Sequence, residues 1–282
     1  MAKRLTLAAA AACIAANYPA GAQDETGSDR ETLIVSAART PIEESRLANA
    51  STIISREDIE RRQARYLSDI LRTVPGFSVS VSGPVGTQTQ VRVRGGEANH
   101  VLVLIDGAPA NDPATGDEFR WEYLSTANIE RIEIVRGPQS ALWGSDAIGG
   151  VVRIVTRSGG AGNGGNAYVE SGSENTLNAA FGGSFGGDAW SVGLGIEQLA
   201  TDGFNISRSG NERDDADIAT ATLNARFTPS EALTFTLGAR GVDAYTQFDA
   251  VDFSATGLPA DSDVATETRQ SFAHIGTTLG AA

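Results

Sequence analysis

Cysteine and lysine are almost absent from this sequence of 282 residues, and neither occurs after residue 13. The one cysteine, Cys13, lies in an apolar run from Leu5 to Ala16 that follows two basic residues. That run is too short to span a bilayer, and with Ala20-Gly21-Ala22 behind it the pattern is typical of a secretory signal peptide, residues 1–22. No leucine stands three residues before Cys13, which argues against a lipid-modified cysteine. The mature chain then has no thiol for disulfide or metal chemistry.

Positive charge is scarce as well. Without the signal peptide, 20 basic residues, all of them arginine, stand against 35 acidic ones, for a net charge of −15. Binding to nucleic acid needs a basic face, so nucleic acid is excluded as a partner. His100 and His274 each lack a second histidine or a cysteine nearby, which argues against a zinc site and against acid–base catalysis.

Enzyme signatures are also missing. No G-x-S-x-G stands at a strand-to-helix turn, where a nucleophilic serine would lie. Gly160 to Gly164 has the composition of a dinucleotide-binding loop, but an alternating strand pattern follows it instead of a helix. We therefore expect no catalytic residues and no enzymatic activity.

Helical and strand patterns alternate in residues 41–158. Ser55 and Asp58 have the spacing of a capping box at a helix start, and a second helical pattern begins at Leu67 and ends at Pro75-Gly76. The unbroken apolar run Val101–Ile105 indicates a central strand covered on both faces. Further strands are predicted at residues 79–81, 91–93, 129–136 and 151–156. The pattern predicts an α+β domain with one small mixed sheet and two helices.

The period changes after a glycine-rich linker, residues 159–165. From residue 166 to 282, apolar side chains alternate with small or polar ones in segments about ten residues long, as in residues 190–196. Tight turns alternate with long acidic connections, which run over residues 199–217 and 242–267. This asymmetry is the signature of an antiparallel transmembrane β-barrel. A soluble β-sandwich with one wet face shows the same alternation, but the signal peptide and the turn asymmetry favour the barrel.

About six such segments fit into residues 166–282, whereas a barrel that encloses a folded domain needs ~22 strands. An open edge in lipid would leave unpaired amides, each costing several kcal/mol. We therefore expect the sequence to hold the first strands of an incomplete barrel, that is, a fragment.

A β-favouring run, Glu31–Arg39, follows the polar residues 23–30. It is either the first strand of the fold or a free strand that adds itself to the edge of a partner's sheet.

Four motifs together resemble the TonB-dependent outer-membrane receptors, most closely their cobalamin branch. They are E-T-L-I-V-S-A-A-R at 31–39, L-S-D-I-L-R-T-V-P-G-F at 67–77, V-R-G-G-E-A-N-H-V-L-V-L-I-D-G at 93–107, and I-E-R-I-E-I-V-R-G-P-Q-S-A-L-W-G-S-D-A-I-G-G-V-V-R-I-V-T at 129–156. Siderophore receptors share these motifs. The resemblance implies that residues 41–158 are a plug domain. In residues 166–282 the resemblance lies in the arrangement of strands and turns more than in the amino-acid sequence.

The resemblance implies a transport mechanism. A scarce bulky ligand, either a corrinoid or an iron-siderophore, is captured outside, and a signal through the plug exposes the TonB box in the periplasm. TonB, driven by the proton gradient of the inner membrane, pairs with that box and opens the plug. Residues 23–40 would be a disordered tail that holds the box, Thr32, Leu33, Ile34, Val35, Ser36 and Ala37. The expected location is the cell outer membrane, in contact with its lipid.

By the same resemblance, two polar plug loops face outward, residues 82–90 and 110–117. The candidate ligand-binding residues are Ser82, Thr87, Gln88, Thr89, Gln90, Asn111, Asp112 and Thr115. Such loops suit hydrogen bonding from a rigid support, although ordinary turns have the same composition. Charge on the faces of the plug is expected from Arg92, Arg94, Arg131, Glu133 and Arg136.

A structural calcium ion is the one cofactor considered. Asp214, Asp215 and Asp217 lie in the loop where cobalamin receptors place calcium ligands, and Asp243 and Asp249 lie at the next long loop. Clustered carboxylates suit a hard cation, but their spacing matches no EF-hand, and acidic outer loops are commonly just solvated.

Three other functions place different demands on the sequence. A signalling receptor would carry an extra domain of ~80 residues before the box, where only residues 23–30 stand. A passive porin would need neither a plug nor a tethered strand. A non-functional receptor fragment is the third.

Overall fold

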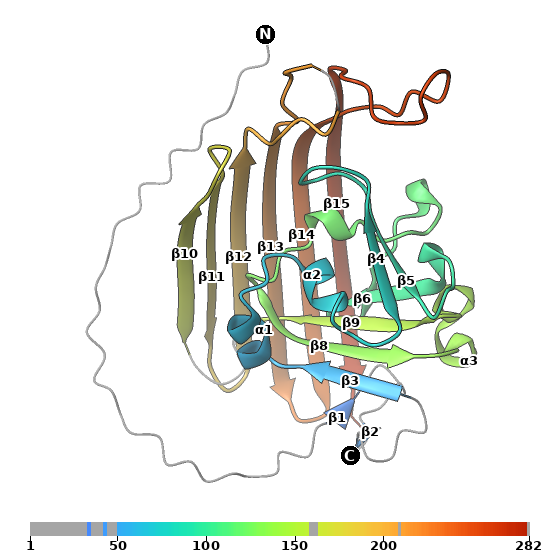
Figure 1. The fold of residues 1–282 in the computed structure, drawn as a ribbon. Coiled ribbons are helices and arrows are strands. Elements are labelled where there is room, and N and C mark those ends of the chain that lie inside the picture. Colours follow the sequence, from blue (N-terminus) through green and yellow to red (C-terminus); the bar gives the residue numbers. More distant parts are fainter. Residues whose placement is uncertain (1–32, 35–41, 44–49, 158–162, 208–209, 281–282) are drawn as a thin grey trace. The chain divides into compact units, whose positions relative to one another are not determined.

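The computed structural model describes residues 33–34, 42–43, 50–157, 163–207 and 210–280. The expected signal peptide, most of the expected tail and most of the glycine-rich linker lie outside these residues. The described part consists of an α/β domain, residues 50–157, and a sheet of six long strands that follows it, which we call the strand sheet (Figure 1).

A five-stranded sheet forms the centre of the α/β domain. Across the sheet the order is β3 (Ala50–Ile54), β8 (Ile129–Arg136), β9 (Gly150–Thr156), β6 (Val101–Ile105) and β7 (Ala108–Pro109). β6 runs parallel to β9, and the other neighbours are antiparallel. The mixed sheet agrees with the prediction, and all five residues of β6 are buried as expected. The middle position, however, belongs to β9 and not to β6.

The helices begin where the sequence indicates. α1 (Arg56–Arg62) has the predicted capping box, in which the Ser55 hydroxyl accepts from the Asp58 amide and the Asp58 carboxylate accepts from the Ser55 amide, both at 3.2 Å. α2 (Leu67–Leu71) is shorter than predicted. The remaining helices are α3 (Ser140–Trp143), η2 (Ala98–His100), η3 (Pro113–Thr115), η4 (Trp121–Tyr123) and η5 (Ser145–Ala147).

A hairpin of β4 (Phe77–Val81) and β5 (Thr89–Val93) forms a separate two-stranded sheet. Alternate residues of β5 are buried, because one face of the hairpin covers the core. That core joins both helices to the five-stranded sheet through Ile59 of α1, Leu67 and Leu71 of α2, and Val103 and Ile132 of the sheet, each at most 2% exposed.

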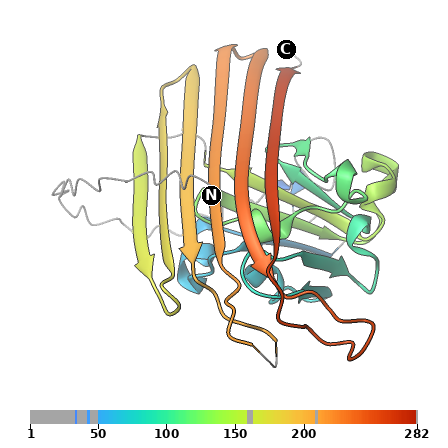
Figure 2. The same ribbon diagram turned by 90° about the horizontal axis from the view of Figure 1, so that it is seen from above.

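The strand sheet is antiparallel throughout, with neighbours in sequence order. Its strands are β10 (Gly164–Ser171), β11 (Leu177–Gly186), β12 (Trp190–Thr201), β13 (Ala216–Ser230), β14 (Leu233–Phe248) and β15 (Val264–Leu279). Figure 2 shows them side by side from β10 to β15. β10 and β15 each have one paired neighbour among the described residues, so the sheet is not closed into a barrel. β10 begins two residues before the predicted boundary.

The two faces of the strand sheet differ in the predicted way. One face carries large apolar side chains that remain exposed, among them Phe181 (47% exposed), Trp190 (50%) and Ile196 (59%). Register places these side chains opposite one another, as with Phe181 and Ile196. The opposite face carries Asn178, Ser191 and Asn224, which are buried or nearly so. An apolar outer face and a polar inner face are what a lipid-exposed strand layout requires.

The long connections are shorter than predicted. They cover residues 202–215 and 249–263, because β12, β13, β14 and β15 continue to pair beyond the ends of the alternating apolar pattern. Strands pair through their backbones and need no apolar side chains to do so. The polar ends of these strands are therefore predicted as loops from the sequence.

The segment expected to be a free strand is already paired. β1 (Leu33–Ile34) pairs with β2 (Ile42–Glu43), with Leu33 opposite Glu43 and Ile34 opposite Ile42. The other residues of the expected box, Thr32 and Val35–Ala37, lie outside the described residues.

Within the part of the chain that the structure describes, every helix is too short or too polar to cross a membrane.

Candidate functional site

The first loop that the sequence predicts to face outward, residues 82–90, is only partly accessible. Ser82 and Gln88 are exposed, whereas Thr87 and Thr89 are 7% and 6% exposed. The hydroxyl of Thr87 donates to the carbonyl of Pro84, and the amide of Thr89 donates to Glu122 at 3.2 Å. Gln90 donates to Glu118. Of the five candidate ligand-binding residues here, Ser82 and Gln88 are therefore the accessible ones.

The second such loop is held by its own candidate residues. The side chain of Asn111 accepts from the Val103 amide at 2.8 Å and donates to the carbonyls of Val101 and Asp117. Asp112 accepts from the Ala114 amide, and the Thr115 hydroxyl donates to the Asp112 carbonyl. These side chains maintain the shape of the loop, as expected for residues that support a binding surface.

The α/β domain contacts the strand sheet mainly through its second half. Asn128 donates to the Thr222 hydroxyl at 2.7 Å, and Asn224 donates to the Arg157 carbonyl at 2.8 Å. Gln270 of β15 donates to the Asp112 carboxylate at 3.0 Å. The α/β domain thus packs on the polar inner face of the strand sheet, which we call its seat.

Two glycines of β12 make this approach possible. A Cβ at Gly195 would lie 2.8 Å from Cγ of Asn128, and a Cβ at Gly193 would overlap the carbonyl oxygen of Arg157. A side chain at residue 193 would require the backbone of the α/β domain to move away, and one at residue 195 would require the side chains of Asn128 and Thr222 to move.

Two oppositely charged, half-buried residues of the inner face that the sequence did not reveal lie next to the domain. Arg240 of β14 donates to the carbonyl of Tyr123, and Glu197 of β12 is bonded to Ser125 and to Tyr168. Next to them, Tyr123 packs on an apolar patch of Leu199, Ile218, Val242 and Ala244. The inner face is therefore polar near the short turns and apolar toward the long loops.

The predicted charges of the α/β domain take two roles. Glu133 is fully buried and accepts from Arg131 at 3.1 Å and from Arg153 at 2.9 Å. Arg136 donates to the carbonyls of Pro75 and Ser51. Glu133 and Arg136 therefore make contacts within the domain and do not add charge to its surface. Arg92 donates to Ser80 and Gln90, and Arg94 is exposed.

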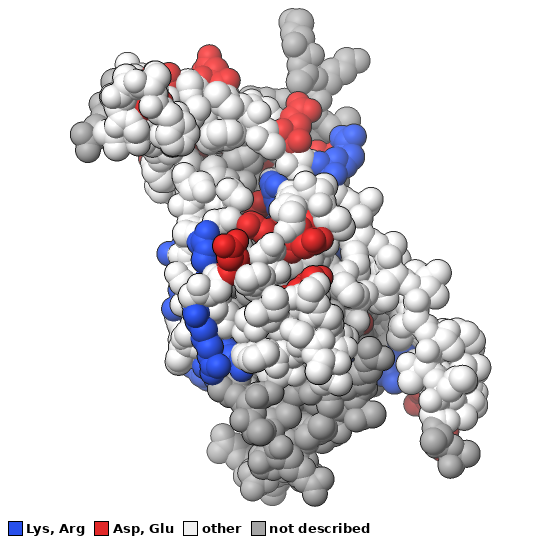
Figure 3. All heavy atoms as spheres, turned by 90° about the vertical axis from the view of Figure 1, so that its right-hand side faces the viewer, with Lys and Arg blue, Asp and Glu red and all other residues white. Residues whose placement is uncertain are grey.

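Charges of both signs gather in separate patches on the face of the molecule in Figure 3. Every basic side chain in that view is an arginine, because Lys3 lies outside the described residues.

The expected calcium residues are not brought together as a group. Asp217 and Asp243 are exposed on the outer face, where Asp217 accepts from Gln198 and Asp243 pairs with Arg269 at 2.8 Å. Asp215 is partly buried near Gln247. Instead, carboxylate oxygens of Glu212, Asp249 and Asp261 lie within 4.8 Å of one another.

Of the expected calcium residues, Asp249 belongs to this cluster, and Asp214 interacts electrostatically with two of its members. Asp214 is fully buried, and both burial and the neighbouring carboxylates of Asp249 and Asp261 raise its pKa. The pKa of Glu212 is raised by burial and by Asp214 and Asp249. Groups of this kind accept a bound cation readily, since the cation removes the repulsion between them.

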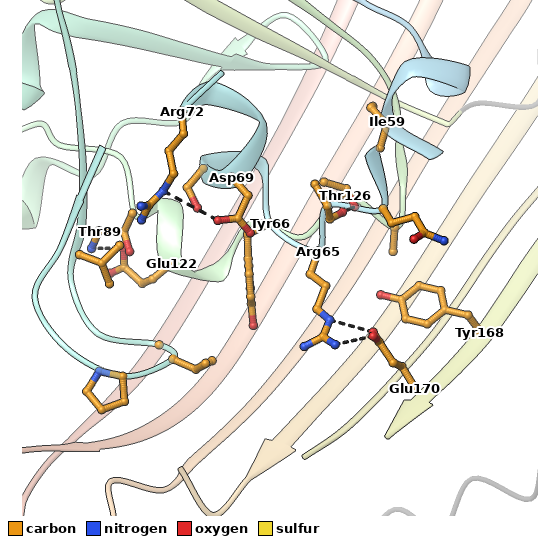
Figure 4. A pocket seen from close by; sticks show the side chains of 18 of the residues that line it. Ile59, Arg65, Tyr66, Asp69, Arg72, Thr89, Glu122, Thr126, Tyr168 and Glu170 are labelled. Atoms are coloured by element: carbon orange, nitrogen blue, oxygen red, sulfur yellow. Dashed lines mark hydrogen bonds and ion pairs between the residues drawn. The ribbon is translucent and has the colours of Figure 1, made fainter. Parts of the chain in front are cut away.

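A cavity of about 990 Å³ lies between the α/β domain and β10. The connection of α1 to α2, the loop at Gly83–Gly86 and β10 line it. In Figure 4, Arg65 and Glu170 reach toward each other across it, and their ion pair joins the two walls. Tyr66 is half-buried at the same place, and loss of solvation raises the pKa of its phenol.

Comparison with known proteins gives the class. Residues 43–151 match the family model described as TonB-dependent Receptor Plug Domain. The fold resembles that of the ferripyoverdine receptor of the outer membrane of Pseudomonas aeruginosa, with a TM-score of 0.67 at 16% identity over 86% of this chain and 34% of that chain.

Two further receptors are similar. A variant of the ferric enterobactin receptor PfeA of P. aeruginosa has a TM-score of 0.64 at 21% identity, over 89% of this chain and 40% of that chain. The ferric yersiniabactin uptake receptor FyuA of Yersinia pestis has a TM-score of 0.57 at 16% identity, over 81% and 37%. The chain thus spans between a third and two fifths of the length of these receptors.

The chain therefore has the plug domain and the strand layout of a TonB-dependent receptor, whose location is the outer membrane. The α/β domain is the plug. The predicted fold is confirmed, and residues 43–151 match the plug-domain family, whereas the cobalamin branch has no support from these receptors, all of which are named for iron-carrying ligands.

Proposed function

We propose that the receptor takes up an iron-siderophore across the outer membrane with energy supplied through TonB, and that it performs no catalysis. The observation that carries the proposal is a plug domain seated on the polar face of a strand sheet whose other face is apolar. A passive pore has no use for such a seat. The three similar receptors are each named for a ferric siderophore, and this favours a siderophore over a corrinoid as the ligand.

Uptake by whole cells tests the ligand class. Cells that carry the receptor, with and without TonB, are given ferric enterobactin, ferripyoverdine and labelled cyanocobalamin. We expect TonB-dependent accumulation of a ferric chelate. Accumulation of cyanocobalamin alone would replace the siderophore by the corrinoid, and equal uptake without TonB would contradict the mechanism.

The partner of β1 is proposed to be TonB. Leu33 and Ile34 already have strand geometry, and their pairing with only two residues of β2 leaves little to displace. Leu33→Pro should abolish energised uptake while surface binding of the chelate persists, because proline removes a pairing amide. Leu33→Val, which retains the amide and the strand preference, is the control and should transport normally.

We also propose that Glu212, Asp249 and Asp261 hold a calcium ion, with Asp214 beside them. The cluster joins the loop of residues 202–215 to that of residues 249–263, so a bound ion would hold the two loops together. Luminescence of terbium, a calcium substitute, should appear with the parent and disappear with Glu212→Gln. Asp217→Asn, on the outer face, should leave the signal unchanged.

A further inference from the structure

One residue of the plug contacts both loops that hold candidate ligand-binding residues. Glu118 directly follows the second loop, and its carbonyl accepts from the Asp112 amide at 3.0 Å and from the Thr115 hydroxyl at 3.3 Å. These bonds close the second loop at its base. The carboxylate of Glu118 is bonded to the first loop, where the side-chain amide of Gln90 donates to both of its oxygens at 3.0 Å.

The side chain of Gln90 is fixed in the orientation that this contact needs. Its carbonyl oxygen accepts from Arg92 at 2.6 Å, so its amide nitrogen faces Glu118. Both Gln90 and Glu118 are partly buried, which protects the bond between them from water. A hydrogen bond to a charged group is stronger than one between neutral groups. The bond is therefore stronger than the neutral one from Thr87 to Pro84 that shapes the first loop.

The other contacts of the two loops lead to different parts of the molecule. In the first loop, a Cβ at Gly86 would lie 2.6 Å from the Thr246 hydroxyl of β14, so this loop lies against the strand sheet. In the second loop, Asn111 is bonded to β6, and Asp112 is bonded to β15. Of the hydrogen bonds that the described residues make, those of Glu118 join one loop to the other.

We propose that Glu118 is a positioning residue that holds the two loops at one fixed separation, so that they bind the ligand as a single surface. Fixing the separation in advance strengthens binding, because the loops need no further ordering when the ligand arrives. Glu118 acts through the loops and does not touch the ligand itself. This inference rests on the proposed uptake function, to which it adds the residue that sets the shape of the binding surface.

The separation of the loops is measured without any ligand. The mature chain has no cysteine, so Gln88→Cys and Ala114→Cys, both at exposed positions, place one spin label on each loop. In the detergent-solubilised receptor we expect a narrow distribution of label distances. Glu118→Ala should widen it, whereas Glu118→Gln, which retains an oxygen for Gln90, should keep it narrow. Glu60→Ala makes the same substitution in α1, away from both loops, and is the control.

Binding to cells that lack TonB tests the consequence for the ligand. The unlabelled parent and its variants are given ferric enterobactin, ferripyoverdine and cyanocobalamin. For a compound that the parent binds, Glu118→Ala should raise the dissociation constant by a factor of about 2 to 10, the worth of one hydrogen bond. The number of sites per cell should stay the same, which shows that the variant is folded. Glu118→Gln and Glu60→Ala should bind as the parent does.

The two measurements separate this inference from the uptake proposal. If the parent binds none of the three compounds, the uptake proposal fails, and the label distances alone decide the role of Glu118. An unchanged distance distribution in Glu118→Ala overturns the inference. An unchanged dissociation constant for a compound that the parent binds overturns it as well.

Discussion

The plug and the strand sheet both contain strands with alternating side chains, but they bury opposite faces. In the plug, Val91 and Val93 of β5 are at most 2% exposed in the core, while Arg92 between them is only half-buried. In the strand sheet, Leu194 of β12 is 39% exposed on the apolar face, while the residues of the opposite face meet the plug. The plug is thus organised around an apolar interior, and the strand sheet around a polar one. The comparison teaches that alternation defines the two faces of a strand, and the surroundings decide which one is covered.

The largest effect is expected in the interior of the plug. Leu104→Ala should lower the free energy of plug unfolding by roughly 2–5 kcal/mol, because it leaves a cavity among fully buried side chains. Urea unfolding of the detergent-solubilised receptor, followed by the fluorescence of the buried Trp121, measures it. Leu194→Ala is the matched control on the outer face. An equal loss for both variants would contradict the division between the two regions.

A charged side chain introduced on the apolar face of the strand sheet should destabilise the sheet. Leu194→Arg is expected to lower the stability of the sheet in a bilayer by about 2–4 kcal/mol if the position lies near the midplane. Thr236→Arg, on the inner face of β14, should cost much less. Heat-modifiability on unboiled gels measures the folded fraction of both variants. If Leu194→Arg and Thr236→Arg lower that fraction equally, the two faces of the sheet have the same surroundings and the prediction is wrong.

A smaller effect is expected for the buried charge of the plug. Arg153→Met removes one of two guanidinium groups from the fully buried Glu133 and should lower plug stability by about 1–3 kcal/mol. Arg131→Met removes the more exposed partner and should cost about 0–1 kcal/mol. The same unfolding measurement decides. A larger loss of stability for Arg131→Met than for Arg153→Met would show that the exposure of the arginine does not determine how much each ion pair contributes.

The smallest effect is a pH dependence confined to the long loops. The pKa of Asp214 is raised above 3.8, so the folded loop binds a proton that the unfolded loop has already released. Loop stability is therefore greatest at low pH and is lost as the pH rises from about 3.8 through the raised pKa. Protease cleavage within residues 202–215 should accelerate over that range, and calcium should reverse it. Because the pKa of Glu212 in the same loop is also raised, Asp214→Asn should weaken the dependence and the double variant Asp214→Asn/Glu212→Gln should remove it. A dependence unchanged in the double variant would refute the assignment.

Much of the plug could be predicted from local patterns. The capping box at Ser55 and the buried run at Val101–Ile105 depend on neighbours in sequence, and both are confirmed. The position of β9 in the middle of the sheet was missed, because strand order depends on contacts between distant segments. Glu197 and Arg240 of the inner face were missed for the same reason, although two charges in the inner row were a signal available in the sequence.

The acidic loops show a second limit. Asp217 and Asp243 have the parity of the outer rows, which also hold Leu223 and Phe235, so their outward position could have been read from the alternation. The cluster of Glu212, Asp249 and Asp261 could not, because it arises from two loops whose paths are not periodic.

The glycines at 193 and 195 have a consequence for exchanging parts between receptors. Gly193 is matched to the backbone carbonyl of Arg157, and Gly195 is matched to the side chain of Asn128. A plug transplanted from another receptor would have to present an equally close carbonyl and an equally close side chain at these points, or the junction would retain a gap. Conversely, a receptor with alanine at residue 195 would need a plug that carries a smaller residue than Asn128. Chimeric receptors should therefore assemble only when these pairs are exchanged together.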